Sequence, residues 1–354
     1  DMHDHYEKIA AFLKSSSLDA FPSSAVLEAK RSVLDTIGCM IAGMDTPLGH
    51  GLRKLAGRFK DENGTRVLGM TFPVAPFAAA MANSYMANAH DADDGHRRSR
   101  LHAGGIIIPA ALASAQENNK SGREFLEAII VGFELGYRAG MVTTGWDAYH
   151  GSAMGSTFGA AAAVGRLMDL SPDEIINAMG IAEMQAPNCM LMGWVQARNA
   201  PMIKEGMGWS AASGLMSAYM AQSGIRGTLT IFNGADDLSE IDTLGKAFEV
   251  ERHYFKSHPG CRWTQVSLQT LQMLMADHAI SNEDIREITV HANSHAAYLD
   301  NPCPATIENA QYSSPFVMAA ALADGACGPE QMQDEKLADP NILEMARRIR
   351  VVPE

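Results

Sequence analysis

The sequence is dominated by segments in which apolar residues recur at three- and four-residue spacing, a pattern typical of α-helices. Helix start signals such as Ser171-Pro172-Asp173-Glu174 and stop signals such as Gly43, Gly140 and Gly224 bound these segments. We therefore expect a large all-α domain over residues 1–245. Its expected helices cover residues 25–43, 76–90, 106–117, 123–142, 154–168, 173–184 and 207–222.

The pattern changes after about residue 245. In "IREITVHAN" (285–293), apolar Ile288, Val290 and Ala292 alternate with polar residues, as in a half-buried strand. Residues 246–354 are thus expected to form a smaller α+β lid domain, which makes the fold class mainly α. The cleft between two such domains is the default site. This domain is expected to hold helices at 263–276 and 315–323 and a second strand at 348–352.

Charge and composition exclude some classes of protein. The formal net charge is −13, and no basic cluster is longer than that of Arg97, Arg98 and Arg100, so the chain lacks the basic surface of a nucleic-acid binder. No apolar run approaches the roughly 18 residues of a membrane span, and the N-terminus has no signal-peptide pattern. The ending "RRIRVVPE" leads us to expect a truncated C-terminus.

The cysteines point to a reducing environment. They are odd in number, widely spaced and form no CxxC pair, so neither a disulfide framework nor a zinc site is predicted. We expect reduced thiols and a cytoplasmic protein. The five positions are Cys39, Cys189, Cys261, Cys303 and Cys327.

A glycine repeat predicts close helix packing. Gly151, Gly155 and Gly159 recur every fourth residue and are followed by four alanines, so one helical face is almost bare. The spacing matches neither a P-loop nor a dinucleotide-binding fingerprint. We infer tight packing in the core and no nucleotide cofactor.

The stretch "NAHDADDGHRRSRLHAGG" (88–105) concentrates histidine, aspartate and arginine. One interpretation is a magnesium site formed by Asp91, Asp93 and Asp94 in a magnesium-dependent enzyme. Diphosphate enzymes of that kind need carboxylates spaced DDxxD, and Arg97 stands where the last carboxylate belongs. A solvated polar loop and a proton-transfer site are the other interpretations.

Two histidines precede predicted helix starts. His102 comes before Ala-Gly-Gly and an apolar helix with Pro109 expected in its first turn, and His150 comes directly before the glycine-spaced helix. The partial positive charge of a helix N-terminus attracts carboxylates and disfavours imidazolium. A histidine held there stays neutral near pH 7 and is suited to general-base catalysis.

Cations at segment junctions are the expected partners of an anionic substrate. Lys204 lies in "NAPMIKEGMGWSAASG", and Lys256 lies in "HYFKSHPGCRW" close to Arg262. In so acidic a chain, such cations are candidate clamps for a substrate with several carboxylates.

These pieces, in this order, resemble the MmgE/PrpD family, which includes 2-methylcitrate dehydratase, cis-aconitate decarboxylase and iminodisuccinate epimerase. The resemblance covers nearly the whole chain and implies a helical domain with an α+β lid, usually in a homodimer. It also implies a C-terminal return segment, which we expect to be absent from this sequence. The matching stretches are "SVLDTIGCMIAG", "ANAHDADDGHRRSRLHAGGIIIPAALASAQ", "YHGSAMGSTFGAAAAVGRLMDLS", "IKEGMGWSAASG", "YFKSHPGCRWTQ" and "AQYSSPFVMAAALADG".

The resemblance also implies a site. Its catalytic pocket would consist of Asp91, His102, His150, Lys204 and Lys256. Its substrate contacts would be Gly95, His96, Arg262, Tyr312 and Phe316. Gly95 replaces a threonine and Phe316 a tyrosine of some members, and Ala103, Gln265 and Val266 also depart from the common pattern. No metal and no cofactor are implied.

The expected chemistry is the formation or protonation of a carbanion next to a carboxylate. Lysines would stabilise the enolate charge while a histidine moves the proton and Asp91 orients it. The leading hypothesis is a 2-methylcitrate dehydratase-like lyase acting on a small di- or tricarboxylate. The family alternatives are an epimerase and a decarboxylase, and the alternatives from other classes are the magnesium enzyme and a catalytically silent helical binding protein.

Overall fold

The computed structural model describes residues 2–142, 153–233 and 238–354. The chain forms two compact units, each assembled from separate stretches of sequence. Unit 1 comprises Asp1–Ala89, Asp93–Cys189 and Glu205–Phe255, and unit 2 comprises His90–Ala92, Met190–Lys204 and Lys256–Glu354. The division at residue 245 stays a prediction.

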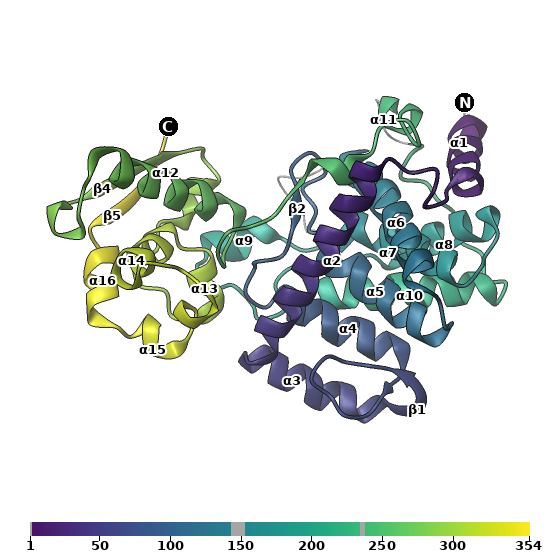
Figure 1. The fold of residues 1–354 in the computed structure, drawn as a ribbon, viewed down its shortest axis with the longest axis horizontal. Helices are drawn as coiled ribbons and strands as arrows, with labels where there is room; N and C mark the ends of the chain where they lie inside the picture. Colours follow the sequence, from purple (N-terminus) through teal and green to yellow (C-terminus); the bar gives the residue numbers. More distant parts are fainter. Residues whose placement is uncertain (1, 143–152, 234–237) are drawn as a thin grey trace. The chain divides into compact units, whose positions relative to one another are not determined.

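Unit 1 is almost entirely helical, as the periodicity predicts (Figure 1). Its strands are β1 (Lys60–Thr65) and the antiparallel pair β2 (Gly95–His96) and β3 (His253–Tyr254). Its helices are α1 (Met2–Ser15), α2 (Ser23–Met44), α3 (Pro47–Ala56), α4 (Pro76–Ala87), α5 (Gly104–Glu117), α6 (Gly122–Val142), α7 (Ala153–Leu167), α8 (Pro172–Gln185), α10 (Met207–Gln222) and α11 (Ser239–Asp242).

Helices α6 and α7 approach each other through glycine. A Cβ on Gly159 would lie 2.5 Å from the carbonyl oxygen of Gly132, and one on Gly132 would lie 2.7 Å from the carbonyl oxygen of Gly159. Gly155 makes a similar approach to the backbone of Gly136, at 3.0 Å. The predicted close packing is therefore present at Gly155 and Gly159, whereas Gly151 lies outside the described residues.

Helix α5 contains a proline that its neighbour accommodates. The helix begins at Gly104, so Pro109 lies in its interior rather than in its first turn, as the sequence had suggested. Proline lacks the N–H that would bond the carbonyl four residues earlier, which is that of Gly105. The Ser84 hydroxyl of α4 donates to this carbonyl at 2.6 Å and supplies the missing hydrogen bond.

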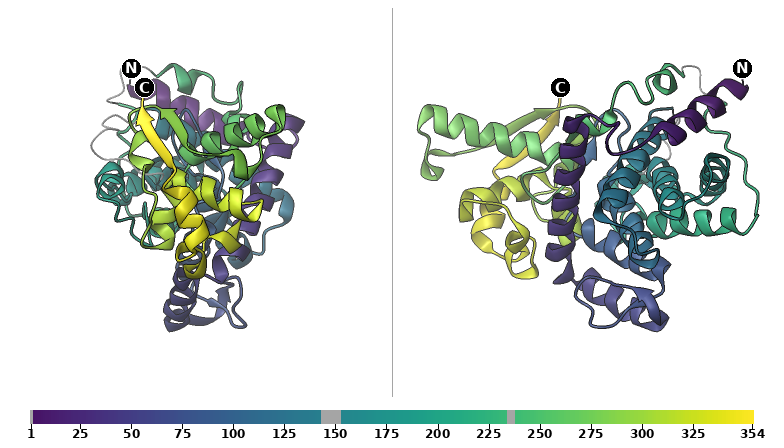
Figure 2. Two further views of the ribbon diagram at one scale, coloured as in Figure 1. Left: turned by 90° about the vertical axis from the view of Figure 1, so that its left-hand side faces the viewer. Right: turned by 45° about the vertical axis from the view of Figure 1, so that its right-hand side comes forward.

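Unit 2 is a small α+β assembly. Strands β4 (Ile288–Ala292) and β5 (Ile349–Pro353) form a parallel pair in which Ile288 faces Ile349, and they run side by side in Figures 1 and 2. Its helices are α9 (Leu191–Gln196), α12 (Arg262–His278), α13 (Ile307–Gln311), α14 (Ser314–Asp324), α15 (Asp334–Leu337) and α16 (Pro340–Ala346).

The core of unit 2 joins these elements. Leu268 and Leu271 of α12, Phe316 of α14 and Ile349 of β5 are buried in one apolar cluster. The expected fold class, mainly α with a large helical part and a small α+β part, is confirmed. Among the described residues, no helix has both the length and the apolar character needed to cross a membrane.

Gly159→Ala is expected to lower the free energy of unfolding by about 1–3 kcal/mol, because its methyl group forces α6 and α7 apart. Helix propensity alone predicts the opposite sign, since alanine is better than glycine inside a helix by about 1 kcal/mol. Urea unfolding measures the difference. Gly122→Ala is the control, because a Cβ there meets no described atom within 4 Å; equal stabilities of the two variants would contradict the packing argument.

Candidate active site

The N-terminus of α5 binds a carboxylate of the protein itself. Asp94 is fully buried, and its Oδ1 accepts a hydrogen bond from the N–H of Gly104 at 3.0 Å. Its Oδ2 accepts one from the Ser32 hydroxyl of α2 at 2.6 Å. Unpaired amides and a partial positive charge make a helix N-terminus a favourable anion site. The sequence predicted an anion here, and the structure supplies Asp94.

Two glycines make this approach possible. A Cβ on Gly104 would lie 2.5 Å from Asp94 Oδ2, and one on Gly105 would lie 2.7 Å from Asp93 Oδ2. Asp93 also accepts a hydrogen bond at Oδ1 from the Asn88 side chain at 2.8 Å. Glycine is therefore needed at both positions of the Gly-Gly pair in "LHAGG", because two carboxylates lie where side chains on the first turn of α5 would otherwise be.

His102 is held by the backbone of the same aspartate. Its Nδ1 lies 2.8 Å from the carbonyl oxygen of Asp94. A carbonyl only accepts, so Nδ1 carries the proton, and Nε2 has the lone pair when the ring is neutral. The Asp93 carboxylate lies 3.7 Å from Nδ1, and the His102 side chain is 15% exposed. His102 thus has the orientation and access that a proton-transfer group requires.

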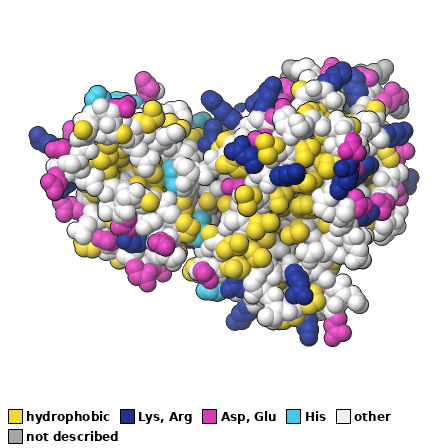
Figure 3. All heavy atoms as spheres, viewed as in Figure 1, with side chains coloured by type: hydrophobic (Ala, Val, Ile, Leu, Met, Phe, Trp, Pro, Cys, Tyr) yellow, Lys and Arg dark blue, Asp and Glu magenta, His cyan; other side chains and the backbone are white. Residues whose placement is uncertain are grey.

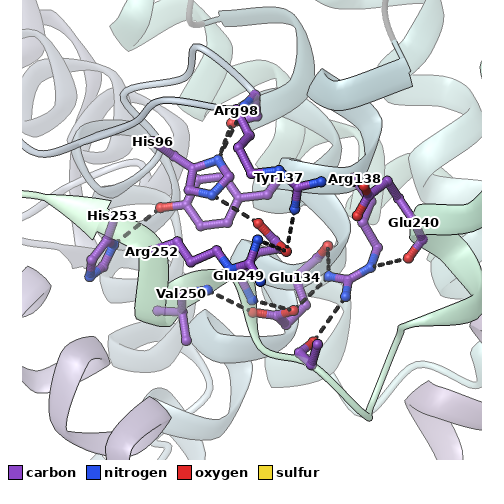
Figure 4. Close-up of polar contacts among 12 residues, drawn as sticks. His96, Arg98, Glu134, Tyr137, Arg138, Glu240, Glu249, Val250, Arg252 and His253 are labelled. Carbon is purple, nitrogen blue, oxygen red and sulfur yellow. Dashed lines mark hydrogen bonds and ion pairs between the residues drawn. The ribbon is translucent and has the colours of Figure 1, made fainter.

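His96 has a structural environment instead. Its side chain is fully buried, with Nδ1 2.8 Å from the Ser99 hydroxyl and Nε2 3.1 Å from Glu249 Oε2. Its ring stacks on Tyr137 with the ring centroids 4.1 Å apart (Figure 4). Both ring nitrogens have protein partners, and a contact between His96 and substrate stays a prediction.

Buried charges anchor this part of unit 1 to α6 (Figure 4). The five N–H groups of Arg138 match five hydrogen bonds, including one to Glu134 Oε2 at 2.6 Å. Burial raises the pKa of Glu249, but the His96 hydrogen bond and the Arg98 charge outweigh it and hold that pKa at about 2. The segment that leads to β3 is therefore fixed by paired charges.

Gly95 lies against a tyrosine that sequence reasoning missed. It pairs with Tyr254 across β2 and β3, and a Cβ on Gly95 would lie 2.3 Å from the Tyr254 hydroxyl oxygen. The threonine found in some relatives would not fit here unless Tyr254 moved. Only the strand pairing reveals this contact, because the two residues are far apart in the sequence.

A second group of candidate residues lies in unit 2. The Lys256 ammonium is 2.7 Å from Asp91 Oδ1 and 2.6 Å from the Asp91 carbonyl oxygen, and the side chains are 0% and 4% exposed. The Lys204 ammonium donates to Gln311 Oε1 at 2.7 Å. Sequence reasoning did not predict Gln311 as a partner of Lys204.

Asp91 and Lys204 have strained backbones. Their φ angles are +52° and +41°, in the left-handed region that residues with a Cβ seldom adopt. Such a conformation costs about 1–3 kcal/mol and tends to occur at functional sites. Seven described residues other than glycine have a positive φ, and two of them are predicted catalytic residues.

Three predicted catalytic residues lie where the chain passes between units. Asp91 is in the three-residue stretch His90–Ala92, Lys204 ends the stretch Met190–Lys204, and Lys256 directly follows Phe255. Helical periodicity cannot identify these positions, since they lie outside the regular helices.

Two family models match this chain. The models for the MmgE/PrpD N-terminal and C-terminal domains match residues 7–251 and 258–354. The chain belongs to the MmgE/PrpD family. The predicted resemblance is confirmed over almost its full length.

Known relatives of this MmgE/PrpD chain include decarboxylases. A cis-aconitate decarboxylase from Aspergillus terreus is 28% identical, over 97% of this chain and 77% of the relative. The cis-aconitate decarboxylase-like protein oryM from Aspergillus oryzae is 29% identical, over 89% and 73%. The human cis-aconitate decarboxylase is 22% identical, over 98% and 76%.

The remaining predicted residues of the MmgE/PrpD site have different environments. Phe316 is fully buried in the core of unit 2, so its ring is a packing residue. Tyr312 packs edge-on against Trp194 with the ring centroids 4.9 Å apart. Arg262 is the first residue of α12 and is half-buried. His150 lies outside the described residues.

The pKa of His258 depends on the neighbouring Lys256 and can be measured. Burial and the neighbouring Lys256 charge lower the pKa of His258 to about 4. We expect Lys256→Met to raise this pKa while leaving it below 6.5, because burial, the larger cause, remains. Imidazole NMR titration measures it, with Lys246→Met, on an exposed side chain, as the control. An unchanged His258 pKa would contradict the charge at Lys256.

The lowered pKa of His258 predicts how the free energy of unfolding changes with pH. The unfolded chain protonates His258 near pH 6.5 and the folded chain only near pH 4, so the stability that His258 contributes is full above pH 6.5 and is lost as the pH falls towards 4. His258→Asn should therefore lose less stability than the parent over this interval. Urea unfolding at pH 6.5 and at pH 4 measures the loss in each protein, and an equal loss in the parent and His258→Asn would contradict the lowered pKa.

Proposed function

We propose that this MmgE/PrpD protein is a cofactor-independent lyase that acts on a small di- or tricarboxylate. Decarboxylation of cis-aconitate is the first reaction to test, because three relatives carry that activity, or likeness to it, in their names. The sequence had favoured dehydration, with decarboxylation as an alternative. The names of these relatives support testing decarboxylation first.

One observation carries the proposal, and it is the hydrogen bond between His102 Nδ1 and the Asp94 carbonyl oxygen. It leaves Nε2 as the nitrogen that exchanges a proton with the substrate. The Asp93 carboxylate lies 3.7 Å from Nδ1, on the side of the ring where an aspartate orients a catalytic histidine. In this role His102 is the catalytic residue, and Asp93 and Asp94 are positioning residues.

Decarboxylation needs a single proton transfer. The bond to the leaving carboxylate breaks and releases carbon dioxide, and its electron pair stays on carbon as an allylic carbanion. Protonated Nε2 of His102 then donates its proton to that carbanion. Dehydration would need a second acid for the departing hydroxide, and Phe316 has no proton to give. This difference favours decarboxylation for this chain.

Lys204 is our candidate for binding a substrate carboxylate. Its backbone φ is +41°, its side chain is buried, and its ammonium donates to Gln311 Oε1 at 2.7 Å. A buried cation of this kind binds a carboxylate through a charge-assisted hydrogen bond. In a chain of net charge −13, it offsets an unfavourable global field.

The magnesium alternative has less support. Asp91 binds the Lys256 ammonium, and both oxygens of Asp94 bind hydrogen-bond donors. Two of the three carboxylates required for that site are thus committed to protein partners. We propose catalysis without a metal. We also propose a homodimer, because the family resemblance implies one, and a cytoplasmic location, because the scattered cysteines predict reduced thiols.

One incubation distinguishes the alternatives. The purified chain is mixed with cis-aconitate and a panel of citrate-like acids in deuterated water, with and without a chelator, and followed by NMR. Carbon dioxide release with one deuterium incorporated supports decarboxylation, a new alkene formed without release of carbon dioxide indicates dehydration, and deuterium uptake on an unchanged skeleton indicates epimerisation. Loss of turnover with chelator contradicts metal independence, and no turnover favours the silent binding protein.

His102→Gln should lower kcat by about 10²–10⁴-fold, the usual contribution of a general acid or base, with a much smaller change in KM. Steady-state kinetics on the best acid of the panel measure both constants. His291→Gln, on the exposed face of β4, is the matched control and should be unaffected. Parent-like turnover in His102→Gln would remove His102 from the mechanism.

Lys204→Met should lower kcat/KM by about 10- to 100-fold, since it removes a charged hydrogen bond worth about 1.5–3 kcal/mol. The effect should be largest for the acid with the most carboxylates. Lys246→Met is the control for loss of one positive charge. Equal losses in the two variants would mean that Lys204 acts only through net charge.

A further inference from the structure

The short β2–β3 ribbon has two faces that carry different side chains. His96 faces His253, and Gly95 faces Tyr254, across the antiparallel pair. Successive side chains of a strand point to opposite faces, so the two histidines share one face and Gly95 and Tyr254 share the other. The histidine face is buried against Tyr137, whose ring stacks on His96 and whose hydroxyl lies 3.2 Å from His253 Nδ1 (Figure 4). The packing of unit 1 therefore accounts for the histidine face of the ribbon.

On the other face, Tyr254 is the reason for glycine at position 95. Gly95 lies in a strand and its φ is not positive, so its backbone conformation is open to residues with a side chain. A Cβ at this position would lie 2.3 Å from the Tyr254 hydroxyl oxygen and 2.4 Å from the ring carbon that bears it. Glycine inside a strand often marks a place where another group approaches closely. Here that group is a tyrosine hydroxyl.

This hydroxyl lies next to the peptide group that orients His102. Gly95 directly follows Asp94, and the Asp94 carbonyl oxygen lies 2.8 Å from His102 Nδ1. Because the Tyr254 hydroxyl oxygen is so near the Cβ position of Gly95, it is within about 4 Å of the Gly95 Cα, which belongs to the same peptide plane. Gly95 is buried, whereas Tyr254 is half-buried. The hydroxyl is therefore close to the backbone that holds the candidate catalytic histidine, on a side chain that solvent reaches.

We propose that Tyr254 is a specificity-determining residue whose hydroxyl donates a hydrogen bond to a substrate carboxylate beside His102. This inference rests on the proposed function, because it requires an acid bound at His102. Charged side chains of both signs are spread over the molecular face shown in Figure 3. The uncharged tyrosine hydroxyl differs from them, since it selects a carboxylate by the direction of one hydrogen bond rather than by net charge. Gly95 contributes by leaving room for the phenol.

Tyr254→Phe removes this hydrogen bond and keeps the ring against Gly95. KM for the best acid of the panel is expected to rise by about tenfold, with a much smaller change in kcat, because the hydroxyl binds substrate but transfers no proton. Tyr298→Phe, at a residue 46% exposed, is the matched control and should behave as the parent does. A parental KM in Tyr254→Phe, or a loss confined to kcat, overturns the proposal.

Gly95→Ala tests the same contact from the opposite strand. Its methyl group displaces the Tyr254 hydroxyl, so KM should rise as it does in Tyr254→Phe, and the double variant should show no more than the larger single effect. Gly51→Ala is the control, because a Cβ there meets no described atom within 4 Å. Effects that multiply in the double variant would mean that the two residues act independently, which contradicts the proposal.

Direct binding separates this inference from the proposed function. Calorimetric titration with propane-1,2,3-tricarboxylate, which has neither a hydroxyl group nor an alkene, measures binding without turnover. The parent is expected to bind it about tenfold more tightly than Tyr254→Phe does, whichever reaction the enzyme catalyses. Equal binding by the two proteins overturns the inference alone. A parent that neither binds nor turns over any acid overturns the proposed function and this inference with it.

Discussion

The contact on which unit 1 depends is the Asp94 carboxylate at the start of α5. It joins three elements, because one oxygen binds the Gly104 amide, the other binds Ser32 of α2, and the Asp94 carbonyl oxygen binds His102. A buried carboxylate is costly unless it is fully hydrogen-bonded, and here both oxygens have donors. The residue that stabilises the helix start therefore also fixes the orientation of the histidine.

Small residues are needed wherever this unit brings polar groups or backbones close together. Gly104 and Gly105 admit carboxylates to the first turn of α5, and Gly132 and Gly159 let α6 and α7 touch. Close packing of the helices also explains how Ser84 reaches the carbonyl that Pro109 leaves without a donor. Glycine thus allows close approach in both places, of carboxylates to a helix start near the site and of two helices in the core.

The candidate residues of unit 2 are held in a different way. Asp91 and Lys204 adopt left-handed backbone conformations, and their side chains bind Lys256 and Gln311. Strain of this kind persists only where surrounding contacts overdetermine the conformation. The hydrogen bonds from Gly260 to the carbonyl oxygens of His90 and Asp91 are such contacts. These contacts hold the two strained residues in place, and proton and carboxylate chemistry requires rigidly held groups of this kind.

Sequence periodicity predicted most of the helices and both strands of unit 2, because these patterns are local. The capping box at Ser171 illustrates this, since its partner Glu174 is three residues away. The same reasoning placed Pro109 in a first turn, whereas α5 begins at Gly104 and the distant Ser84 supplies the hydrogen bond that the proline lacks. The role of His96 as a substrate contact stays a prediction, and its partner Glu249 lies far along the chain.

The sequence by itself therefore determined the fold class, the family and the set of residue types available for catalysis, since each is written in local spacing and motif order. Only the tertiary structure decided which carboxylate caps α5, which nitrogen of His102 carries the proton, and that Lys204 binds Gln311. These facts depend on side chains that meet across gaps of up to about a hundred residues, for example the 107 between Lys204 and Gln311. Helical periodicity carries no information about such pairs, because it records which face of a helix is buried and not what it is buried against.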